Sequence, residues 1–529
     1  MFDLKDLTLE EKIGQMIIAG FPSRYYDENV NEIIEKYKIG NVILFAGNIG
    51  TKEEIVKLTS KLQENFIKHT KNPGFISIDQ EGGMVTRIYK GAAFFPGNMA
   101  FAAANVKGST FEEGKTEGEE LRALGINMNL APVMDVNCNP LNPLIGTRSY
   151  GDDPQKVAEL GVNLIKGLNE SKVIAVCKHF PGHGDTDKDS HLSLPAVNHD
   201  MDRLEKVELL PFKKAIEAGA PAIMSAHVLF PAIESEKLPA TLSYKVLTQL
   251  LKKKMGFMGL IITDCMEMKA IASYYGSEKA AVMAVKAGAD MICISHSKDV
   301  QIKCVQEIKK AVSEGTIEEN RINESVKKIL QVKAKYNLYD NCYPDLKKVQ
   351  TFVGCKENKD FAEKISDRSI TLIKDERNLI PVSEDEKVVS ISTKAVALTG
   401  AEYEVEMNIP FCDRLKDRFG GKSFVIPLDP EENLIKKIAD SVKGAEKIII
   451  GIYNASSHKG QIELIKKINE VNKNIIVVSL RNPYDILKIN DVSTYVDAYE
   501  YTNLSVKSTI KVISGEIMPM GHSPAGGKL

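Results

Sequence analysis

A regular alternation of short apolar runs with longer amphipathic stretches fills the first ~300 residues and constrains the fold more than any other feature of the sequence. The apolar runs lie at 15–21, 41–46, 75–79, 128–132, 174–178, 223–227, 260–264 and 291–295. Near-continuous apolar runs are typical of parallel strands that helices cover on both faces. Eight strand-then-helix units predict an α/β fold, a (β/α)8 barrel of the TIM type. An open, doubly wound sheet uses the same alternation and is the alternative.

A second α/β region follows the barrel pattern. The Lys-rich helical stretch 322–336 ends the repeat, and residues 337–358 contain Pro344 and several turn formers, which indicates a linker. Strands are expected at 388–392, 424–428, 447–452, 475–480 and 497–501, and helices at 361–374, 433–442 and 457–471. We therefore expect a barrel over 1–336, a linker over 337–358, and a three-layer α/β/α sandwich over 359–529.

Charge and composition exclude several classes of partner. The chain of 529 residues has 69 Lys+Arg and 71 Asp+Glu, so no broad positive field exists to hold nucleic acid or an anionic membrane. No run of ~18 apolar residues suggests a membrane span, and the first residues lack the pattern of a signal peptide. The eight cysteines form no C-x-x-C pair. We expect a cytoplasmic protein with neither a nucleic-acid nor a membrane partner.

Charged and polar residues follow directly after several of the predicted strands. The C-terminal ends of the strands form the active site of a barrel, and a charge there is expensive to bury unless it is paired or used. Any one of these residues can belong to a structural ion pair, but their repetition at one rim indicates an enzyme. They are Asp79, Asp135, Lys178, His179, His227 and Asp264.

The densest polar segment is CKHFPGHGDTDKDSH, residues 177–191, and it admits three interpretations. A metal site is disfavoured because Pro181 and Gly182 break the helix that would bring His179 and His183 to one face, so no metal is expected. A catalytic loop is favoured, because Asp189 and His191 lie two apart and a carboxylate beside an imidazole sets its tautomer. A loop of solvated polar residues is the third reading.

KHFPGHGDTDKDSH, together with IDQEGGMVTR, IGTRSYGDDP and LIITDCMEMKAI, resembles the family-3 glycoside hydrolases, in particular their β-N-acetylglucosaminidase branch. The resemblance covers the barrel and, more weakly, the second domain. It implies that Asp264 is the nucleophile and that His191 is the acid/base, with Asp189 as its partner. It further implies that the sugar is bound by Asp79, Arg87, Arg148, Lys178 and His179. No cofactor is implied.

The activity that the resemblance implies is removal of a terminal, non-reducing N-acetylglucosamine with retention of configuration, through a covalent glycosyl-enzyme. The expected substrates are small saccharides: peptidoglycan fragments (muropeptides) or chitin oligosaccharides. Because an imidazole does not repel an anion as a carboxylate does, phosphate is an alternative acceptor and phosphorolysis an open hypothesis. Two further alternatives are a family-3 β-glucosidase or β-xylosidase, whose acid/base is a Glu of the second domain, and a non-catalytic sugar-binding protein.

Overall fold

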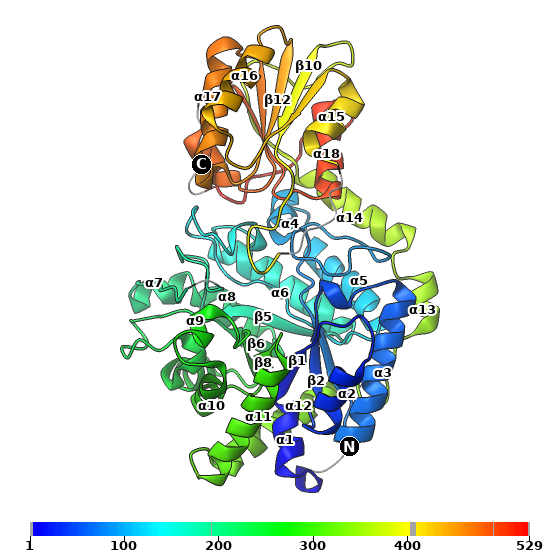
Figure 1. Cartoon of the computed structure of the whole chain (residues 1–529), viewed down its shortest axis with the longest axis vertical. Helices are drawn as coiled ribbons and strands as arrows, with labels where there is room; N and C mark the ends of the chain where they lie inside the picture. Colours follow the sequence, from blue (N-terminus) through cyan, green and yellow to red (C-terminus); the bar gives the residue numbers. More distant parts are fainter. Residues whose placement is uncertain (1–3, 192, 403–408, 490, 527–529) are drawn as a thin grey trace.

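The first domain is a barrel of eight parallel strands (Figure 1). The structure is a computed structural model, and it describes residues 4–191, 193–402, 409–489 and 491–526. The strand order is β7-β6-β5-β4-β3-β2-β1-β8, and a bridge between Ile262 and Met291 joins β7 to β8. This sequential order confirms the predicted barrel and excludes the open, doubly wound sheet. The strands are β1 Ile17–Gly20, β2 Asn41–Leu44, β3 Phe75–Ile78, β4 Met128–Asn129, β5 Ile174–Phe180, β6 Ala222–Ser225, β7 Leu260–Thr263 and β8 Ile292–Ile294.

Helices surround the barrel and begin where the sequence supplies caps. Thr51 and Glu54 form a reciprocal capping box at the start of α3, and Asp153 caps α6, whose first residue is Pro154. The helices are α1 Leu9–Gln15, α2 Glu28–Glu35, α3 Lys52–Thr70, α4 Asn98–Ala104, α5 Ser109–Ala123, α6 Pro154–Glu170, α7 Met201–Lys206, α8 Leu209–Glu217, a π-helix Lys245–Lys254, α9 Lys269–Ala272, α10 Ser277–Ala287, α11 Lys298–Ser313 and α12 Glu319–Lys335. No helix among the described residues is both long and apolar enough to cross a membrane.

The second domain is a six-stranded sheet between two helical layers, which confirms the predicted sandwich. Its order is β11-β10-β12-β13-β14-β9, with only β9 antiparallel. Successive residues of β12 face opposite cores: Ile448 and Ile450 pack toward α16 and α17, and Ile449 toward α15 and α18. The elements are α13 Leu346–Thr351, α14 Lys356–Ser369, β9 Thr371–Asp375, β10 Val388–Ser392, α15 Phe411–Phe419, β11 Lys422–Val425, α16 Glu432–Ser441, β12 Lys447–Ile452, α17 Lys459–Val471, β13 Ile475–Ser479, β14 Thr494–Asp497 and α18 Asn503–Ile513.

The sequence prediction was wrong where β9 forms. Residues 361–374 were expected to be one helix, but α14 ends at Ser369 and Thr371–Asp375 pairs with β14 as an edge strand. The pairing partner lies more than a hundred positions away, so local propensity did not reveal it. The expected linker also contains a helix, α13. The boundaries at 336 and 359 stay predictions.

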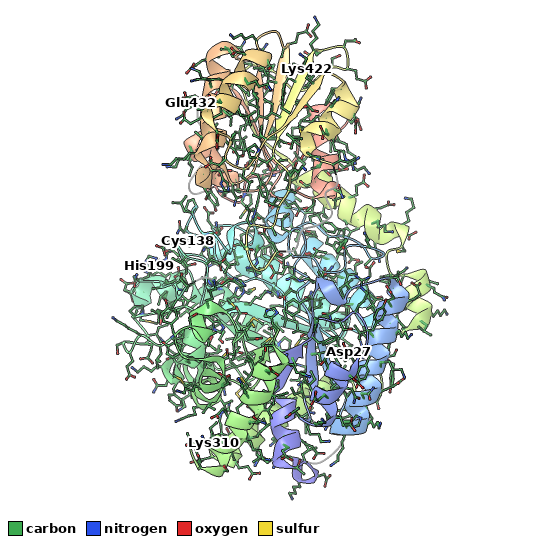
Figure 2. The ribbon with its side chains drawn as sticks, viewed as in Figure 1. Asp27, Cys138, His199, Lys310, Lys422 and Glu432 are labelled. Atoms are coloured by element: carbon green, nitrogen blue, oxygen red, sulfur yellow. The ribbon has the colours of Figure 1, made fainter. Side chains whose placement is uncertain are left out.

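The two domains are joined by specific contacts as well as by the chain. Figure 1 shows the segment after β10 (yellow) descending from the second sheet to the barrel. Glu500 accepts a hydrogen bond of 2.6 Å from the backbone amide of Gly97, and the amide of His522 donates to the Ala103 carbonyl. Because of these contacts, the barrel rim faces the second domain rather than open solvent. Charged side chains such as Lys310, Lys422 and Glu432 lie on the outside of the two domains (Figure 2).

Candidate active site

A cavity of about 280 Å³ lies at the C-terminal ends of the barrel strands. Its lining brings together residues within or directly after β2, β3, β5, β6, β7 and β8 with a segment of the second domain. Of the predicted site residues, it includes Asp79, Arg87, Arg148, Lys178, His179, His191 and Asp264, while Asp189 lies behind His191.

One side of the cavity is a buried network of ion pairs. Lys178 Nζ lies 2.7 Å from Asp79 Oδ1 and 2.6 Å from Glu81 Oε1. Arg148 donates from Nε and Nη2 to the two oxygens of Glu81, at 2.9 and 2.8 Å. Burial opposes ionisation of Glu81, but Arg148 and Lys178 outweigh it and hold its pKa far below the usual range. The paired charges hold the Lys and Arg side chains in place without any ligand.

Glu81 was not among the predicted site residues. It stands two positions after Asp79 in the quoted motif IDQEGG, so the sequence signal was present. Its carboxylate is buried, with 4 % of the residue exposed, and it holds two cations that line the cavity. Glu81 is therefore a positioning residue for Lys178 and Arg148.

Asp264 follows directly after β7 and is partly exposed to the cavity. Its Oδ1 accepts a hydrogen bond of 2.7 Å from the backbone amide of Cys265. Burial raises the pKa of this carboxyl, but the nearby imidazoles of His227, His179 and His191 outweigh burial and lower it below its usual value. Asp264 is therefore an ionised carboxylate at neutral pH, which is the form that can act as a nucleophile.

Asp135, at the barrel rim beside β5, orders the residues that lead into the loop. Its Oδ2 lies 2.7 Å from His179 Nδ1, and its Oδ1 accepts a hydrogen bond of 2.6 Å from the His183 amide. The His183 ring contacts Thr186 and Ser190, and burial lowers its pKa to about 4. His183 is thus a neutral, structural residue that holds the start of the loop.

His191 is held by Asp189 and faces the second domain. Its Nδ1 lies 2.8 Å from Asp189 Oδ1, and its backbone amide donates to the same oxygen at 2.8 Å. The carboxylate therefore engages Nδ1 and leaves Nε2 for other partners. The imidazole also packs against Gly400, where a Cβ would stand only 2.8 Å from its Cδ2.

Residues 400–402 of the second domain form part of the cavity wall. The Ala401 carbonyl accepts a hydrogen bond of 2.9 Å from Arg87 Nη2, and Glu402 forms a buried ion pair with Arg481. Sequence reasoning missed these residues and left the role of this domain open, as a scaffold, a partner surface or a shield for the active site. No local motif surrounds them, so only the packing of the two domains reveals them.

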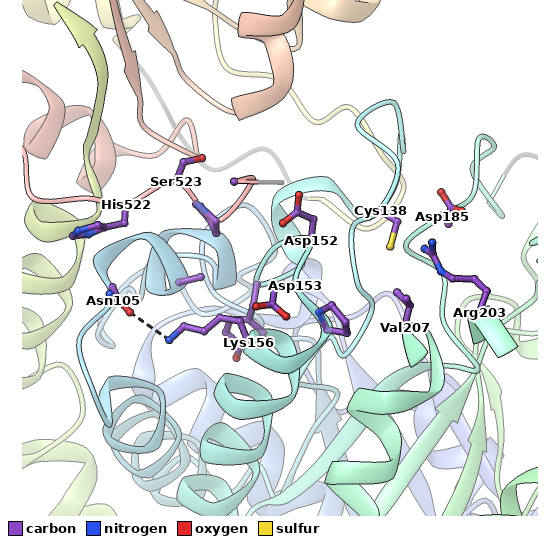
Figure 3. Close-up of a pocket in the computed structure, with 15 residues that line it drawn as sticks. Asn105, Cys138, Asp152, Asp153, Lys156, Asp185, Arg203, Val207, His522 and Ser523 are labelled. Atoms are coloured by element: carbon purple, nitrogen blue, oxygen red, sulfur yellow. Dashed lines mark hydrogen bonds between the residues drawn. The ribbon is translucent and has the colours of Figure 1, made fainter. Parts of the chain in front are cut away.

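A larger hollow of about 920 Å³ lies between the flank of the barrel and the C-terminal tail (Figure 3). It is lined by side chains of mixed charge, including Asp152, Lys156 and Arg203, and by the tail residue His522. None of the predicted site residues lines it. Size alone therefore does not locate the chemistry, and the smaller cavity is the candidate site.

Comparisons with known proteins find relatives over most of the chain. The family model described as "Glycosyl hydrolase family 3 N terminal domain" matches residues 8–332. A curated relative, Beta-hexosaminidase A of Pseudoalteromonas piscicida, is 30% identical, and the match covers 96% of this chain and 93% of the relative.

Solved structures extend the likeness over both domains. A glycoside hydrolase family 3 β-N-acetylglucosaminidase from Paenibacillus sp. str. FPU-7 superposes with a TM-score of 0.91 at 38% identity, covering 98% of this chain and 99% of that one. A β-glucoside phosphorylase superposes with a TM-score of 0.83 at 23% identity, covering 99% and 95%, which shows a shared fold alone.

Proposed function

Because the chain belongs to glycosyl hydrolase family 3, as its motifs indicated, we propose that it is an exo-acting, retaining β-N-acetylglucosaminidase. This activity is supported by the relatives named β-hexosaminidase and β-N-acetylglucosaminidase. The proposed substrate is a terminal, non-reducing β-linked N-acetylglucosamine.

One observation carries the proposal: Asp264 and His191, from distant parts of the chain, line the same cavity. In the first step, Asp264 attacks the anomeric carbon while the imidazolium of His191 gives a proton to the leaving oxygen. In the second step, neutral His191 takes a proton from water, which displaces Asp264 from the sugar. Asp189 stabilises the imidazolium and keeps Nε2 directed away from itself.

The remaining wall of the cavity fits a sugar. Asp79, Lys178 and Arg148 present fixed acceptors and donors for hydroxyl groups, and Arg87 adds a further guanidinium. The volume of about 280 Å³ is near the lower end of the ~300–1,000 Å³ typical of small-molecule sites. A small cavity closed by residues 400–402 favours one terminal sugar over an internal stretch of a polymer.

The test is covalent trapping with a 2-deoxy-2-fluoro or 5-fluoro glycosyl donor, followed by peptide mass mapping. A fluorinated sugar slows hydrolysis of the glycosyl-enzyme, so the label should accumulate on the peptide that contains Asp264. A label on another carboxylate, or release of an inverted product, would refute the retaining mechanism assigned to Asp264.

A β-glucosidase that uses a second-domain glutamate as its acid/base is the main competitor. Glu402 does line the cavity from the second domain, but its carboxylate is bound by Arg481 and by the Leu398 amide at 2.8 Å. Both carboxylate oxygens are thus engaged within the second domain rather than free to reach a glycosidic oxygen. A panel of aryl glycosides decides: turnover of the glucoside without turnover of the N-acetylglucosaminide would reverse the assignment.

Phosphorolysis is a second candidate, favoured by the imidazole that occupies the acid/base position. Arg87 and Lys178 also line the cavity and could donate hydrogen bonds to an anionic acceptor. In this alternative second step, an oxygen of phosphate, rather than of water, attacks the anomeric carbon and displaces Asp264. The product is N-acetylglucosamine 1-phosphate. Failure to detect that product at millimolar phosphate would remove the candidate.

For the natural substrate we propose soluble muropeptides or chitin oligosaccharides, processed in the cytoplasm. Both carry the terminal sugar that the cavity would accept. A comparison of turnover rates on purified muropeptides and on chitobiose tests the proposed substrate. Cell fractionation tests the proposed location.

A further inference from the structure

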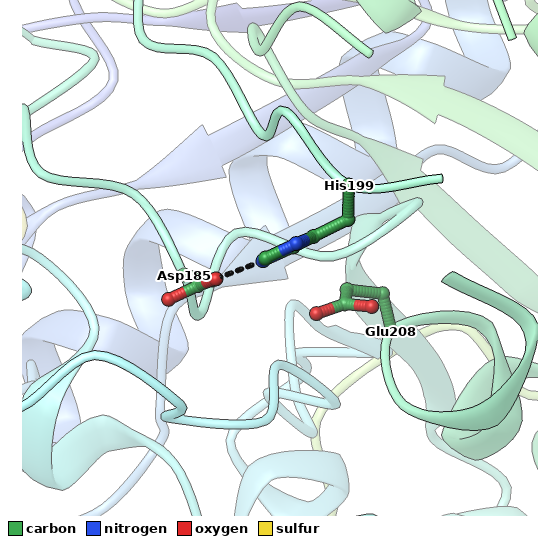
Figure 4. A group of neighbouring side chains, drawn as sticks. All are labelled: Asp185, His199 and Glu208. Carbon is green, nitrogen blue, oxygen red and sulfur yellow. Dashed lines mark hydrogen bonds and ion pairs between the residues drawn. The ribbon is translucent and has the colours of Figure 1, made fainter. Parts of the chain in front are cut away.

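Three ligating side chains converge outside the catalytic cavity: Asp185, His199 and Glu208. One donor atom of each lies within 4.8 Å of those of the other two. Asp185 and His199 form an ion pair, and the Glu208 carboxylate faces that pair from the start of α8 (Figure 4). None of the three lines the cavity that holds Asp264.

Glu208 is the unusual member of this group. Only 3 % of the residue is exposed, and its Oε2 has no hydrogen-bond partner among the described residues. Arg203 reaches only the other oxygen, Oε1, at 3.3 Å. A buried carboxylate oxygen without a partner is costly, so the position calls for a cation on the Oε2 side.

The positions of Asp185, His199 and Glu208 in the chain suggest what a bound ion would do. Asp185 and His199 stand at the two ends of the segment that contains Asp189 and His191. Glu208 directly precedes α8, one of the helices that surround the barrel. His199 lies on the flank of the barrel near the second domain (Figure 2). A bond from one ion to all three residues would join both ends of this segment to the barrel.

We propose that Asp185, His199 and Glu208 bind a divalent ion of the zinc class, which anchors the segment that presents His191. One imidazole and two carboxylates suit Zn²⁺, whereas Ca²⁺ and Mg²⁺ prefer sites built from oxygen alone. Ligand atoms in a tetrahedral site are roughly 3.5 Å apart at bond lengths of ~2.0–2.2 Å, so small side-chain rotations would close the group. The ion would be structural, and the two catalytic steps described above do not pass through it.

The first test is calorimetric titration of chelator-treated protein with Zn²⁺. We expect one equivalent to bind with a dissociation constant of about 10 µM or lower, and Mg²⁺ not to compete. His199→Gln and Asp185→Asn should each weaken binding by at least about tenfold, because even the loss of an outer-shell contact has that effect. Both residues are partly exposed, so these variants should fold, and Glu208→Gln should act in the same direction.

Two control variants make the titration specific. His69→Gln, on α3, removes a partly exposed imidazole far from the group and should leave Zn²⁺ affinity unchanged. Cys138→Ser tests whether a nearby thiol is the true ligand. Unchanged affinity in His199→Gln, loss of binding in Cys138→Ser, or absence of Zn²⁺ binding to the unmodified protein would each overturn the site.

The second test addresses the anchoring role by hydrogen exchange. Zn²⁺ should slow amide exchange in peptides between Asp185 and His199 in the unmodified protein and have no effect in His199→Gln. Binding without this protection would overturn the anchoring role. These readouts do not depend on the proposed activity, so their failure is distinguishable from failure of the catalytic assignment.

Discussion

The carboxylates at the strand ends of the barrel can be compared with those at the strand ends of the second domain. In the barrel, Glu81 is bound by Lys178 and Arg148, and Asp264 is surrounded by imidazoles. In the second domain, Asp497 ends β14 with neither carboxylate oxygen hydrogen-bonded to any described residue. Glu500 accepts hydrogen bonds from the Gly97 amide and Thr502.

The pKa values of these groups move in opposite directions. Cations and imidazoles lower the pKa of Glu81 and Asp264, while burial raises the pKa of Asp497 well above its usual range and that of Glu500 to about 7. Carboxyl groups near strand ends are thus ionised in the barrel, whereas in the second domain Asp497 keeps its proton and Glu500 keeps it in part at pH 7. Of the four carboxyl groups compared, those of the barrel are the ionised ones, which is the form that a glycosyl-transfer nucleophile needs.

The largest effect is expected at the barrel carboxylate that we propose as nucleophile. Asp264→Ala should lower kcat by at least about 10⁴-fold, because no other group replaces the covalent bond to the sugar. Asp497→Asn is the matched control from the second domain and should keep normal kcat. Steady-state assays with an aryl N-acetylglucosaminide measure kcat of both variants. Near-normal turnover by Asp264→Ala would show that Asp264 is not the nucleophile.

The next largest effects are expected for His191→Ala and Asp189→Asn, which should each lower kcat on a disaccharide by about 10²–10⁴-fold. A leaving group that departs without protonation makes the acid unnecessary, so His191→Ala should form the glycosyl-enzyme from an activated aryl glycoside at a nearly normal rate. Pre-steady-state burst measurements separate the two steps. Equal losses on both substrates would argue against acid catalysis by His191.

Stability should respond differently to loss of charge in the two domains. Glu81→Gln leaves Lys178 and Arg148 buried without their shared partner and should lower the free energy of unfolding by about 3 kcal/mol. Asp497→Asn replaces a neutral acid by a neutral amide and should change it by less than about 1 kcal/mol at pH 7. Urea unfolding of both variants at pH 7 measures the difference, and similar values would contradict the contrast.

The pH dependence of stability should report on Glu500. Burial raises the pKa of Glu500 in the folded protein to about 7, above the roughly 4.5 of an exposed glutamate, so the folded protein keeps a proton that the unfolded chain releases. The resulting stabilisation is complete below pH 4.5 and is lost as pH rises through 7, amounting to about 2 kcal/mol between pH 5 and pH 7. Glu500→Gln should remove this loss, and Glu432→Gln, at an exposed position, should not. Parallel pH profiles for the unmodified protein and Glu500→Gln would show that Glu500 is ionised.

The smallest effect tests the contact between the domains at the site. The Cβ of Gly400→Ala would displace the His191 ring, so kcat should fall by about tenfold with little change in KM. Gly444→Ala meets no atom within 4 Å and is the matched control. If both variants have unchanged kcat, Gly400 does not position the imidazole.

Much of the barrel and its rim was predictable from local pattern. Strand-then-helix periodicity depends on burial of neighbouring residues, and each of the eight predicted runs overlaps an observed strand. Asp79 and Asp264 directly follow β3 and β7, and Lys178 and His179 lie near the C-terminal end of β5, so the order of strands in a barrel places all four at one rim. The second sheet was predicted for the same reason, except for β9 and for β14, which shares only Asp497 with the strand expected at 497–501.

Other features depend on residues that are distant in sequence. Arg87 and the Ala401 carbonyl are 314 positions apart, and their contact arises only because the second domain packs on the barrel rim. The ionisation of carboxylates was equally hidden, since Glu81 and Asp497 both carry a carboxyl group and their opposite pKa shifts come from their neighbours. Periodicity and residue type thus established the architecture and the chemistry available to it. Packing selected which groups meet, because the energy of a buried charge depends on the atoms that surround it.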